Sequence, residues 1–522
     1  MIDRFAARFG RPAMTPRGVL LLWGTVLLLL FLMRAFLFTG TDADDAEQLT
    51  YMQSWALGYG ARNPPVFTWL VLMVQPIFGV TVASVAFVKF ALLAGSFYLI
   101  YRSGEIVFGD RALAALAALS PIAVYYVSWD ATFHYTHSVI LAFAVCLTFY
   151  QLLVLERRRD LLSYILFGIG IGFGLQSKYN YLIFLAVLVA GVFANRDMRR
   201  LFLDRRTLIT VAISLLLAAP HYYWLWQQRT LLSAIAKDRF NPGGPSHTPF
   251  DLAGIGETVM AVINFILPLA LFYLLLFPRA WGPAGMRAAP NSRHRRLLDF
   301  VIAGIVLLTL AGVIAFGAVR VRTHYMFLLI LFPIAFLARV QAAGITPRMI
   351  NLFATTLVGL AIIVPTAVVI KYVVDPLRHS KAYYNVPYAA FAAHLKDAGF
   401  TDGTIIGDWF GYPLAGNFRP YFPNARIINL LDWQLLPPKG KNLDRLIAPP
   451  PPGEKGQCLL LWTPTSDGAR KAAVIEKANL LLDAGLSQNT PPHFISAEMT
   501  NGRGRTLRIG YILIQHGPGN CR

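Results

Sequence analysis

Long apolar segments separated by short charged ones fill the first 375 residues of the chain. Because a helix needs about 20 mainly apolar residues to cross the hydrocarbon core of a bilayer, this pattern predicts about eleven transmembrane helices. They are expected at 18–38, 82–102, 112–128, 136–155, 161–176, 179–194, 207–226, 258–277, 300–318, 323–338 and 348–373. The apolar stretch 66–80 is only about 15 residues long, so we expect a helix that lies in the membrane interface.

The positions of arginine and lysine predict the orientation of these helices. With the N-terminus in the cytoplasm, the cytoplasmic segments of the eleven-span arrangement hold roughly twenty Lys and Arg, and the opposite loops hold about seven. Counting 66–80 as a further span would place the basic clusters 157–159 and 196–206 outside, against the positive-inside rule. The first outer loop, 39–81, is therefore expected on the extracytoplasmic side.

After Val373 the composition changes, and no further apolar run is long enough to span a membrane. Helices are expected at 388–398 and 468–486, and strands at 404–408, 426–430, 458–462, 493–497 and 507–515. The Pro-rich stretch 449–453 is expected as a surface loop. The pattern predicts a transmembrane domain over 1–375 and a soluble extracytoplasmic α/β domain over 376–522.

Composition narrows the possible functions. The chain has 522 residues, 56% of them hydrophobic and 14% charged, with a mean hydropathy of +0.53, which is too apolar for a soluble enzyme of this length. Its net charge of +20 lies in short clusters between apolar stretches and not on a basic face interleaved with aromatics. Nucleic acid is therefore not an expected partner, whereas membrane lipids are. Cys458 and Cys521 could form a disulfide only outside the cytoplasm, and two free thiols are an equally open reading.

An acidic run, 42–47, follows the first span and contains Asp42, Asp44, Asp45 and Glu47. One reading is a cap, with Asp44 or Asp45 at the start of a helix over 46–57. Capping needs only one carboxylate, so a cluster of four close to a membrane favours a catalytic role.

The residues around this run resemble a known family. Asp44-Asp45-Ala46, Gly58-Tyr59 and Asn63-Pro64-Pro65 are similar in order and spacing to the Asp-Glu-Ala, Gly-Tyr and His-Pro-Pro motifs of protein O-mannosyltransferase-like glycosyltransferases of family 39, which are related to the lipid A aminoarabinose transferase. Asp45 stands where the family has Glu, and Asn63 where it has His. The resemblance implies a GT-C fold, a bacterial inner membrane location and a polyprenyl-phosphate-linked sugar as donor.

Two further segments match the same family. Trp129-Asp130-Ala131 resembles its Pro-Asp-Ala pattern, although Asp130 could equally cap the fourth span. Gln176-Ser177-Lys178-Tyr179 resembles its Ser-Lys-Tyr segment, and it places Lys178 and Tyr179 at an outer turn. A lysine there could also be an ordinary interfacial residue that extends its amine to water.

Cations at another outer turn also break the positive-inside pattern. Arg320, Arg322 and His324 lie between the ninth and tenth expected spans, and the segment is similar to the family's basic turn that ends in a His-aromatic pair. Arginine binds phosphate oxygens through two parallel hydrogen bonds, so this turn is a candidate grip for a lipid phosphate, with contact to lipid headgroups as the alternative. His221, near another outer end, is a candidate substrate contact or a member of an aromatic belt.

These residues predict a membrane glycosyltransferase that transfers a sugar to an extracytoplasmic acceptor: lipid A, another envelope glycan or a protein. Asp45 is expected to act as general base with Asp44 orienting it, and Lys178, Arg320, Arg322 and His324 to bind the donor phosphate. Asp130, Asn63, Tyr179 and His221 are expected to contact substrate, and inversion follows from direct attack. A divalent metal between the carboxylates is left open. The alternative is a transporter or flippase for a lipid-linked sugar, against which the lack of internal repeats argues.

Overall fold

The computed structural model describes residues 10–59, 63–229, 253–281, 293–317, 321–378, 382–408, 414–429, 456–464, 468–482 and 484–515. Its contacts group the chain into two compact units, one of residues 1–29 and 89–365 and the other of residues 30–88 and 366–522. The first outer loop is therefore grouped with the C-terminal residues. Each unit is described by itself.

Seven helices among the described residues are long and apolar enough to cross a membrane, so the chain is a multi-pass membrane protein. They are Pro16–Leu37, Val82–Phe108, Thr136–Arg158, Thr207–Gln227, Gly254–Leu276, Arg293–Phe316 and Pro347–Arg378. Two helix pairs meet the same criterion but are bent, Arg111–Ala123 with Tyr126–Phe133 by 73° and Thr323–Leu329 with Phe332–Ala342 by 50°. Counting each pair as one span gives up to nine in the described part of the chain.

All eleven expected spans fall on helices, but their number is not confirmed. The two remaining segments are α9 (Leu161–Leu175) and α10 (Tyr181–Ala194), of 15 and 14 residues. At 1.5 Å per residue such helices are about 20 Å long, shorter than the roughly 30 Å of a hydrocarbon core. The helix α4 (Val66–Phe78), expected in the interface, has 13 residues and is likewise too short to cross.

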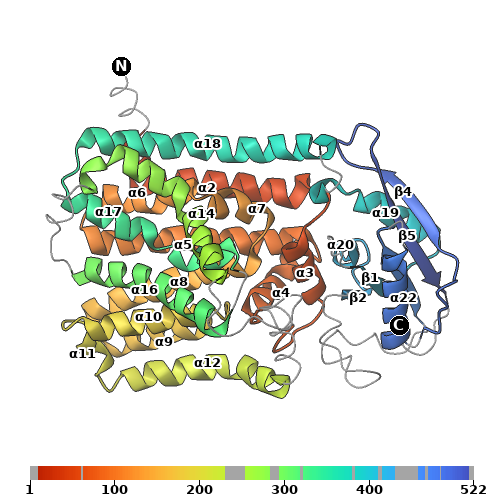
Figure 1. The fold of residues 1–522 in the computed structure, drawn as a ribbon, viewed down its shortest axis with the longest axis horizontal. Helices are drawn as coiled ribbons and strands as arrows, with labels where there is room; N and C mark the ends of the chain where they lie inside the picture. Colours follow the sequence, from red (N-terminus) through yellow and green to blue (C-terminus); the bar gives the residue numbers. More distant parts are fainter. Residues whose placement is uncertain are drawn as a thin grey trace. The chain divides into compact units, whose positions relative to one another are not determined.

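The first unit contains all or most of the following elements (Figure 1): α2 (Pro16–Leu32), α5 (Val82–Phe108), α6 (Arg111–Leu119), η2 (Ser120–Ala123), η3 (Tyr126–Asp130), α7 (Ala131–Phe133), α8 (Thr136–Arg158), α9, α10, α11 (Arg199–Phe202), α12 (Thr207–Gln227), α14 (Ala253–Leu276), η4 (Pro278–Ala280), α16 (Arg293–Phe316), η5 (Thr323–Leu329), α17 (Phe332–Ala342) and α18 (Pro347–Arg378). Of these, α2, α5 and α18 extend into the second unit. The helix α9 packs between α8 and α12, and α10 packs against α16. A Cβ atom on Gly168 or Gly172 of α9 would lie 2.8 Å from Thr210 O or Leu217 Cβ of α12. Glycine spaced by four residues thus allows this close packing, as in many membrane helix pairs.

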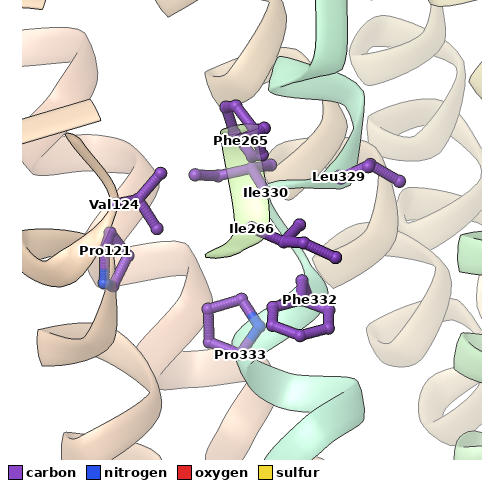
Figure 2. A pocket seen from close by; sticks show the side chains of 8 residues that line it. All are labelled: Pro121, Val124, Phe265, Ile266, Leu329, Ile330, Phe332 and Pro333. Carbon is purple, nitrogen blue, oxygen red and sulfur yellow. The ribbon is translucent and has the colours of Figure 1, made fainter. Parts of the chain in front are cut away.

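The two bent spans meet at an apolar pocket. Its empty volume is about 220 Å³, and Figure 2 shows the lining side chains converging from several helices. They are Pro121, Val124, Phe265, Ile266, Leu329, Ile330, Phe332 and Pro333. Val124 and Ile330 lie in the breaks between the paired helices and are buried. Val124 and Ile330 thus pack against protein in these stretches of irregular backbone, as a chain within a bilayer requires.

The second unit combines the first outer loop with a five-stranded sheet (Figure 1). Its elements are η1 (Met33–Leu37), α3 (Ala43–Tyr51), α4, η6 (Tyr383–Asn385), α19 (Tyr388–Asp397), β1 (Gly403–Gly407), α20 (Leu414–Phe418), β2 (Arg426–Asn429), β3 (Gln457–Trp462), α22 (Ala469–Leu482), β4 (His493–Glu498) and β5 (Thr506–Ile514). The strand order is β2-β1-β3-β5-β4, with the first three strands parallel and the last two antiparallel. This arrangement is the expected α/β fold.

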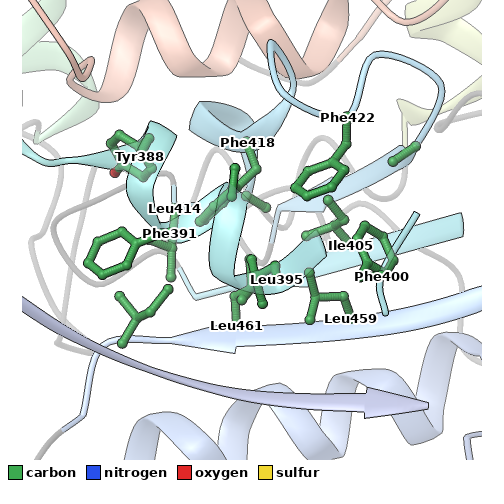
Figure 3. Packing of buried hydrophobic residues seen from close by; sticks show 14 of the residues in the cluster. Tyr388, Phe391, Leu395, Phe400, Ile405, Leu414, Phe418, Phe422, Leu459 and Leu461 are labelled. Carbon is green, nitrogen blue, oxygen red and sulfur yellow. The ribbon is translucent and has the colours of Figure 1, made fainter. Parts of the chain in front are cut away.

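Helices cover both faces of this sheet. On one face, Tyr388 and Phe391 of α19 and Phe418 of α20 pack over Ile405 and Leu459, as Figure 3 shows. On the other face, α22 packs against alternate residues of the same strands, such as Ile406 and Leu460. The parallel strands are buried on both faces, which explains their continuous apolar sequence.

The expected C-terminal elements agree with the structure to within a few residues, apart from two. The helix expected at 468–486 ends at Leu482, and the short helix α20 was not predicted. Cys458 is disulfide-bonded, whereas the described Cys146 is free and buried in α8. Cys521 and the Pro-rich stretch 449–453 lie outside the described residues.

Asp408 stands at the carboxyl end of the central parallel strand and is fully buried. Its Oδ2 accepts a hydrogen bond from Thr463 N at 2.8 Å, and Arg470 Nη1 lies 3.8 Å away. Burial raises the pKa of Asp408 to about 6, outweighing the Thr463 bond and the Arg470 charge. The charged form is therefore destabilised within the folded domain.

This shift predicts how stability depends on pH. A carboxyl group whose pKa is higher in the folded state stabilises the fold fully only below its unfolded pKa of about 3.9, and that contribution is lost as pH rises through about 6. We compare the free energy of unfolding of Asp408→Asn with that of the parent at each pH. The difference should favour the variant by roughly 2–3 kcal/mol more at pH 8 than at pH 4. Thermal melting of the purified protein at both pH values measures this. An equal difference at both pH values would rule out the titration.

Candidate functional site

The acidic run forms the start of a buried helix. α3 begins at Ala43, and within the described residues the Asp42 side chain at its N-cap makes no capping hydrogen bond. The predicted helix 46–57 therefore starts and ends earlier than expected, and the capping reading of Asp44 and Asp45 is wrong. Both carboxylates lie in the first turn, where they favourably face the positive end of the helix dipole.

The two central carboxylates have different surroundings. Asp44 is partly exposed, whereas Asp45 is fully buried. Arg34 of η1, also fully buried, approaches Asp45 Oδ2 through Nε at 2.9 Å and through Nη2 at 2.7 Å. Arg34 lies within the first expected span, 18–38, and was not among the expected site residues. The structure identifies it as the counterion of Asp45.

Aromatic rings and backbone complete the surroundings of Arg34. Its guanidinium carbon lies 5.8 Å from the centre of the Phe38 ring and 5.7 Å from that of Tyr384, and Nη1 donates to Gly40 O at 3.3 Å. A buried charge is tolerated only when it is paired and hydrogen-bonded, and both conditions are met here. Asp45 is therefore ion-paired with Arg34 and closed to solvent.

The Gly-Tyr and Asn-Pro-Pro motifs shape the loop that follows α3. Tyr59 OH donates to Ser54 O at 2.7 Å and accepts from Ala56 N at 3.0 Å, and its ring stacks on Tyr51 at 5.4 Å. Asn63 is half-buried, and Pro65 is the N-cap of α4. The motif residues thus close the loop and start the next helix.

The helices α3 and α4 are joined by a buried polar pair. Thr68 Oγ1 of α4 donates to Gln48 Oε1 of α3 at 2.8 Å. Glu47, the last carboxylate of the run, is also buried and accepts a hydrogen bond from Tyr51 OH at 3.1 Å. Of the carboxylates in α3, Asp44 alone is not buried.

A second cluster of polar residues lies in the first unit and includes Lys178. This side chain is 8% exposed, and its Nζ donates to Ser138 Oγ at 2.9 Å and lies 5.0 Å from the centre of the Tyr325 ring. Asn180 Nδ2 donates to Tyr325 O at 3.2 Å. The Lys178 turn and the basic turn are therefore in direct contact, although about 145 residues separate them along the chain.

Asp130 joins the same cluster through a tyrosine. Tyr135 OH donates to Asp130 Oδ2 at 2.7 Å, His134 Nε2 lies 3.7 Å from Oδ1, and the Tyr135 ring lies 5.3 Å from that of His324. Among the described residues α8 has Tyr135 at its N-cap, and the Asp130 side chain makes no capping hydrogen bond. The capping alternative for Asp130 is therefore not realised.

Tyr135 itself was missed in the sequence. Its φ of 71° and ψ of 38° are left-handed, which costs a non-glycine residue about 1–3 kcal/mol and is often found at functional sites. The chain carries three His-Tyr pairs, 134–135, 221–222 and 324–325, and the last was recognised as part of the basic turn. The first pair, five residues after Asp130, was the available signal.

The other expected site residues are placed as follows. Arg322 is exposed, next to the half-buried His324, and Arg320 lies outside the described residues. His221 is fully buried, with Nε2 at 3.1 Å from Tyr179 OH and its ring stacked on Trp224 at 5.8 Å. His221 and Tyr179 thus form part of an aromatic stack beside the Lys178 turn.

Lys89 is a further charged residue that sequence reasoning passed over. It lies in α5, within an expected span, and is fully buried. An ionisable residue at membrane depth is a functional candidate by default, so its position in the span 82–102 was a sufficient signal. Among the described residues, no group of three His, Cys, Asp or Glu is placed to hold a metal ion.

Comparison with known proteins agrees with this fold and these motifs. Residues 62–224 match the family model of dolichyl-phosphate-mannose-protein mannosyltransferases. Two curated relatives from Rhizobium johnstonii are the lipopolysaccharide core galacturonosyltransferases RgtB, 28% identical over 74% of this chain and 78% of that protein, and RgtA, 29% identical over 78% and 81%. Among solved structures, ArnT from Cupriavidus metallidurans bound to undecaprenyl phosphate matches with a TM-score of 0.60 at 13% identity, over 95% of this chain and 98% of that one. Its apo form gives a TM-score of 0.58.

The fold and the relatives define a membrane glycosyltransferase of the GT-C class. The chain is a glycosyltransferase with a fold like that of ArnT, and it is similar in sequence to two lipopolysaccharide core galacturonosyltransferases. The resemblance found in the sequence is thereby confirmed. Because the relatives are enzymes, the transporter reading loses its support.

Proposed function

We propose that the chain transfers a sugar from a polyprenyl-phosphate-linked donor to lipopolysaccharide or a related envelope glycolipid. The observation that carries this proposal is the cluster in which Lys178 meets the basic turn at Tyr325, because it brings the lysine to the segment that contains Arg322 and His324. Such a cluster suits a phosphate whose negative charge grows as the sugar leaves. The ArnT structure was determined with undecaprenyl phosphate, and the two relatives are named galacturonosyltransferases. Galacturonic acid is therefore the first sugar to test.

In the proposed reaction, an acceptor hydroxyl attacks the anomeric carbon directly. The new glycosidic bond forms as the bond from that carbon to the phosphate oxygen breaks, and the polyprenyl phosphate leaves with the electron pair. The hydroxyl proton passes to a carboxylate, and the configuration is inverted. Lys178, Arg322 and His324 stabilise the leaving phosphate, and we extend this role to Arg320 from its place in the same turn.

The structure changes which carboxylate we assign as the base. Asp45 was expected from the sequence, but it is fully buried against Arg34, and protonating it would break that pair. Asp44 is partly exposed in the same helical turn. We therefore assign proton transfer to Asp44 and the positioning of the first turn of α3 to Asp45. Asp130, Asn63, Tyr179 and His221 are assigned to substrate contacts or to their support.

The proposed location is a bacterial inner membrane, with the N-terminus in the cytoplasm and residues 376–522 outside it. The disulfide at Cys458 supports this orientation, since disulfides persist in oxidising compartments and are rare in the cytoplasm. The excess of arginine in the loops assigned to the cytoplasm supports it independently.

The transfer assay uses purified protein, a polyprenyl-phosphate galacturonic acid donor and lipopolysaccharide lacking that sugar. We expect a gain of one sugar mass on the acceptor by mass spectrometry. Lys178→Gln should lower kcat/KM by about 100-fold, the usual cost of removing one donor that stabilises developing charge. Lys371→Gln is the matched control, because Lys371 forms an ion pair with Asp375 in α18 outside the proposed cluster. Transfer by Lys178→Gln at the parent rate would contradict the phosphate role.

A deletion strain tests the acceptor class in cells. We expect its envelope glycolipids to lack one sugar residue that the parent strain carries, with return of that mass when the gene is restored. The proposed function is wrong if two results are found together. The purified protein transfers neither galacturonic acid nor any other donor sugar, and the envelope glycolipids of the deletion strain match those of the parent.

A further inference from the structure

The helix that carries the acidic run is held at its start by a buried asparagine of the C-terminal residues. Asn417 Oδ1 in α20 accepts from Thr41 N at 2.8 Å, and Asn417 Nδ2 donates to Thr41 O at 3.2 Å. The side-chain amide thus pairs with one residue's backbone through two bonds, as a neighbouring strand would. Thr41 directly precedes the N-cap of α3 and lies three residues before Asp44.

A second amide makes the same kind of pairing after α3 ends. Gln53 Oε1 accepts from Ile427 N at 2.7 Å, and Gln53 Nε2 donates to Ile427 O at 3.1 Å. Ile427 belongs to β2, the edge strand of the sheet, whose other neighbour is β1. Gln53 hydrogen-bonds the free edge of this strand. The helix α3 is therefore linked to the sheet domain at both ends, to α20 before its start and to β2 after its end.

Between the two amide pairs, α20 and α3 are in close contact. A Cβ atom on Gly416 would lie 2.4 Å from Ala46 O and 2.9 Å from Thr50 Oγ1. Only glycine allows this approach, since real Cβ atoms essentially never come so near a backbone oxygen. The backbone just before the run is also held, because Thr39 N and Gly40 N both donate to Tyr384 O, at 3.0 and 3.3 Å.

We propose that the C-terminal sheet domain positions the catalytic helix α3, with Asn417 and Gln53 as the positioning residues. Neither amide lies in α3 itself. Asn417 bonds the backbone just before α3, and Gln53, just after α3, bonds the backbone of β2. The inference rests on the proposed function in assigning catalysis to Asp44. A GT-C enzyme with this arrangement uses its soluble domain to hold the base in place, and a displacement of about 1 Å at a reacting group costs about 100-fold in rate.

The chain supplies a matched control for these amides. Asn479 of α22 makes the same two-bond pairing with a single residue, donating from Nδ2 to Leu486 O at 2.8 Å and accepting at Oδ1 from Leu486 N at 2.8 Å. This pairing is internal to the sheet domain and involves no residue of α3. Removing the Asn479 pairing loses the same two kinds of hydrogen bond but leaves the bonds that hold α3 in place.

The experiment compares Asn417→Ala, Gln53→Ala and Asn479→Ala in the full-length purified protein. We expect the first two to lower kcat by about 10- to 100-fold with the donor KM nearly unchanged, and Asn479→Ala to leave both at the parent value. Hydrogen exchange at the amides of α3 should rise at least tenfold in the first two variants and stay unchanged in the third. Exchange in β1, β3 and β5 should be unaltered in all three.

Two results would overturn the inference. One is unchanged exchange in α3 in Asn417→Ala and Gln53→Ala. The other is a loss of kcat in Asn479→Ala as large as in Asn417→Ala, which would mean that general destabilisation explains the effect. If the parent protein transfers no sugar from any donor, the proposed function fails, and the exchange measurement alone decides whether the domain holds α3.

Discussion

Asp44→Asn is expected to lower kcat for sugar transfer by about 100- to 10,000-fold, the usual contribution of a general base. Asparagine keeps the size of the side chain but cannot accept the acceptor hydroxyl's proton. Asp44 is partly exposed, so thermal stability should change little. The measurement is steady-state transfer with the polyprenyl-phosphate donor, paired with a melting curve of each variant.

Asp42→Asn is the matched control for this substitution. Asp42 belongs to the same run, is also partly exposed, and its side chain makes no cap hydrogen bond in the described structure. We expect less than a tenfold change in its kcat, well below the effect of removing a general base. Equal losses in the two variants would mean that the charge of the run as a whole, rather than Asp44, supports transfer.

Arg34→Met is expected to destabilise the protein by roughly 3–5 kcal/mol, because it leaves the Asp45 carboxylate buried without its partner. The same loss is expected for Asp45→Leu, which leaves the guanidinium unpaired beside Phe38 and Tyr384. The double variant Arg34→Met/Asp45→Leu removes both charges, and replacement of a whole buried pair by apolar side chains is often neutral. Its melting temperature should therefore return close to that of the parent.

The double variant also separates the roles of the two aspartates. If Asp44 is the base, the folded double variant should transfer sugar at least tenfold faster than Asp44→Asn. The double variant keeps Asp44 and loses only part of what positions the first turn of α3. A well-folded double variant with no transfer would restore Asp45 as the base. Melting curves and transfer rates of the parent, the two single variants, the double variant and Asp44→Asn, measured together, decide between these assignments.

Much of the fold could be predicted because its signals are local. Each expected span and each expected C-terminal strand corresponds to an observed element, since apolar runs and strand patterns are read from neighbouring residues. The helix α20 escaped because it has five residues, and short helices carry little periodicity. The bends of 73° and 50° in two spans also escaped, since irregular backbone is supported by packing from distant helices.

The candidate site was predictable only in part. Motif spacing selected Asp44, Asp45, Lys178 and Asp130, yet it could not tell which carboxylate is buried. Tyr135 was missed because its hydrogen bond to Asp130 and its left-handed backbone depend on the turn between α7 and α8, which leaves little periodicity in the sequence. Asn417 was missed because nothing near it in the sequence points to Thr41, 376 residues away.

The sequence by itself determined the membrane class of the protein, its α/β C-terminal part and the segments that carry its charged residues, because hydrophobic patterning and loop charge act over a few residues. The tertiary structure decided which of these residues act together. It paired Arg34 with Asp45, joined the Lys178 turn to the basic turn, and tied α3 to the sheet through Asn417 and Gln53. Burial and hydrogen bonding between distant segments arise only when the chain is packed, so the proposed division of roles between Asp44 and Asp45 depends on the fold.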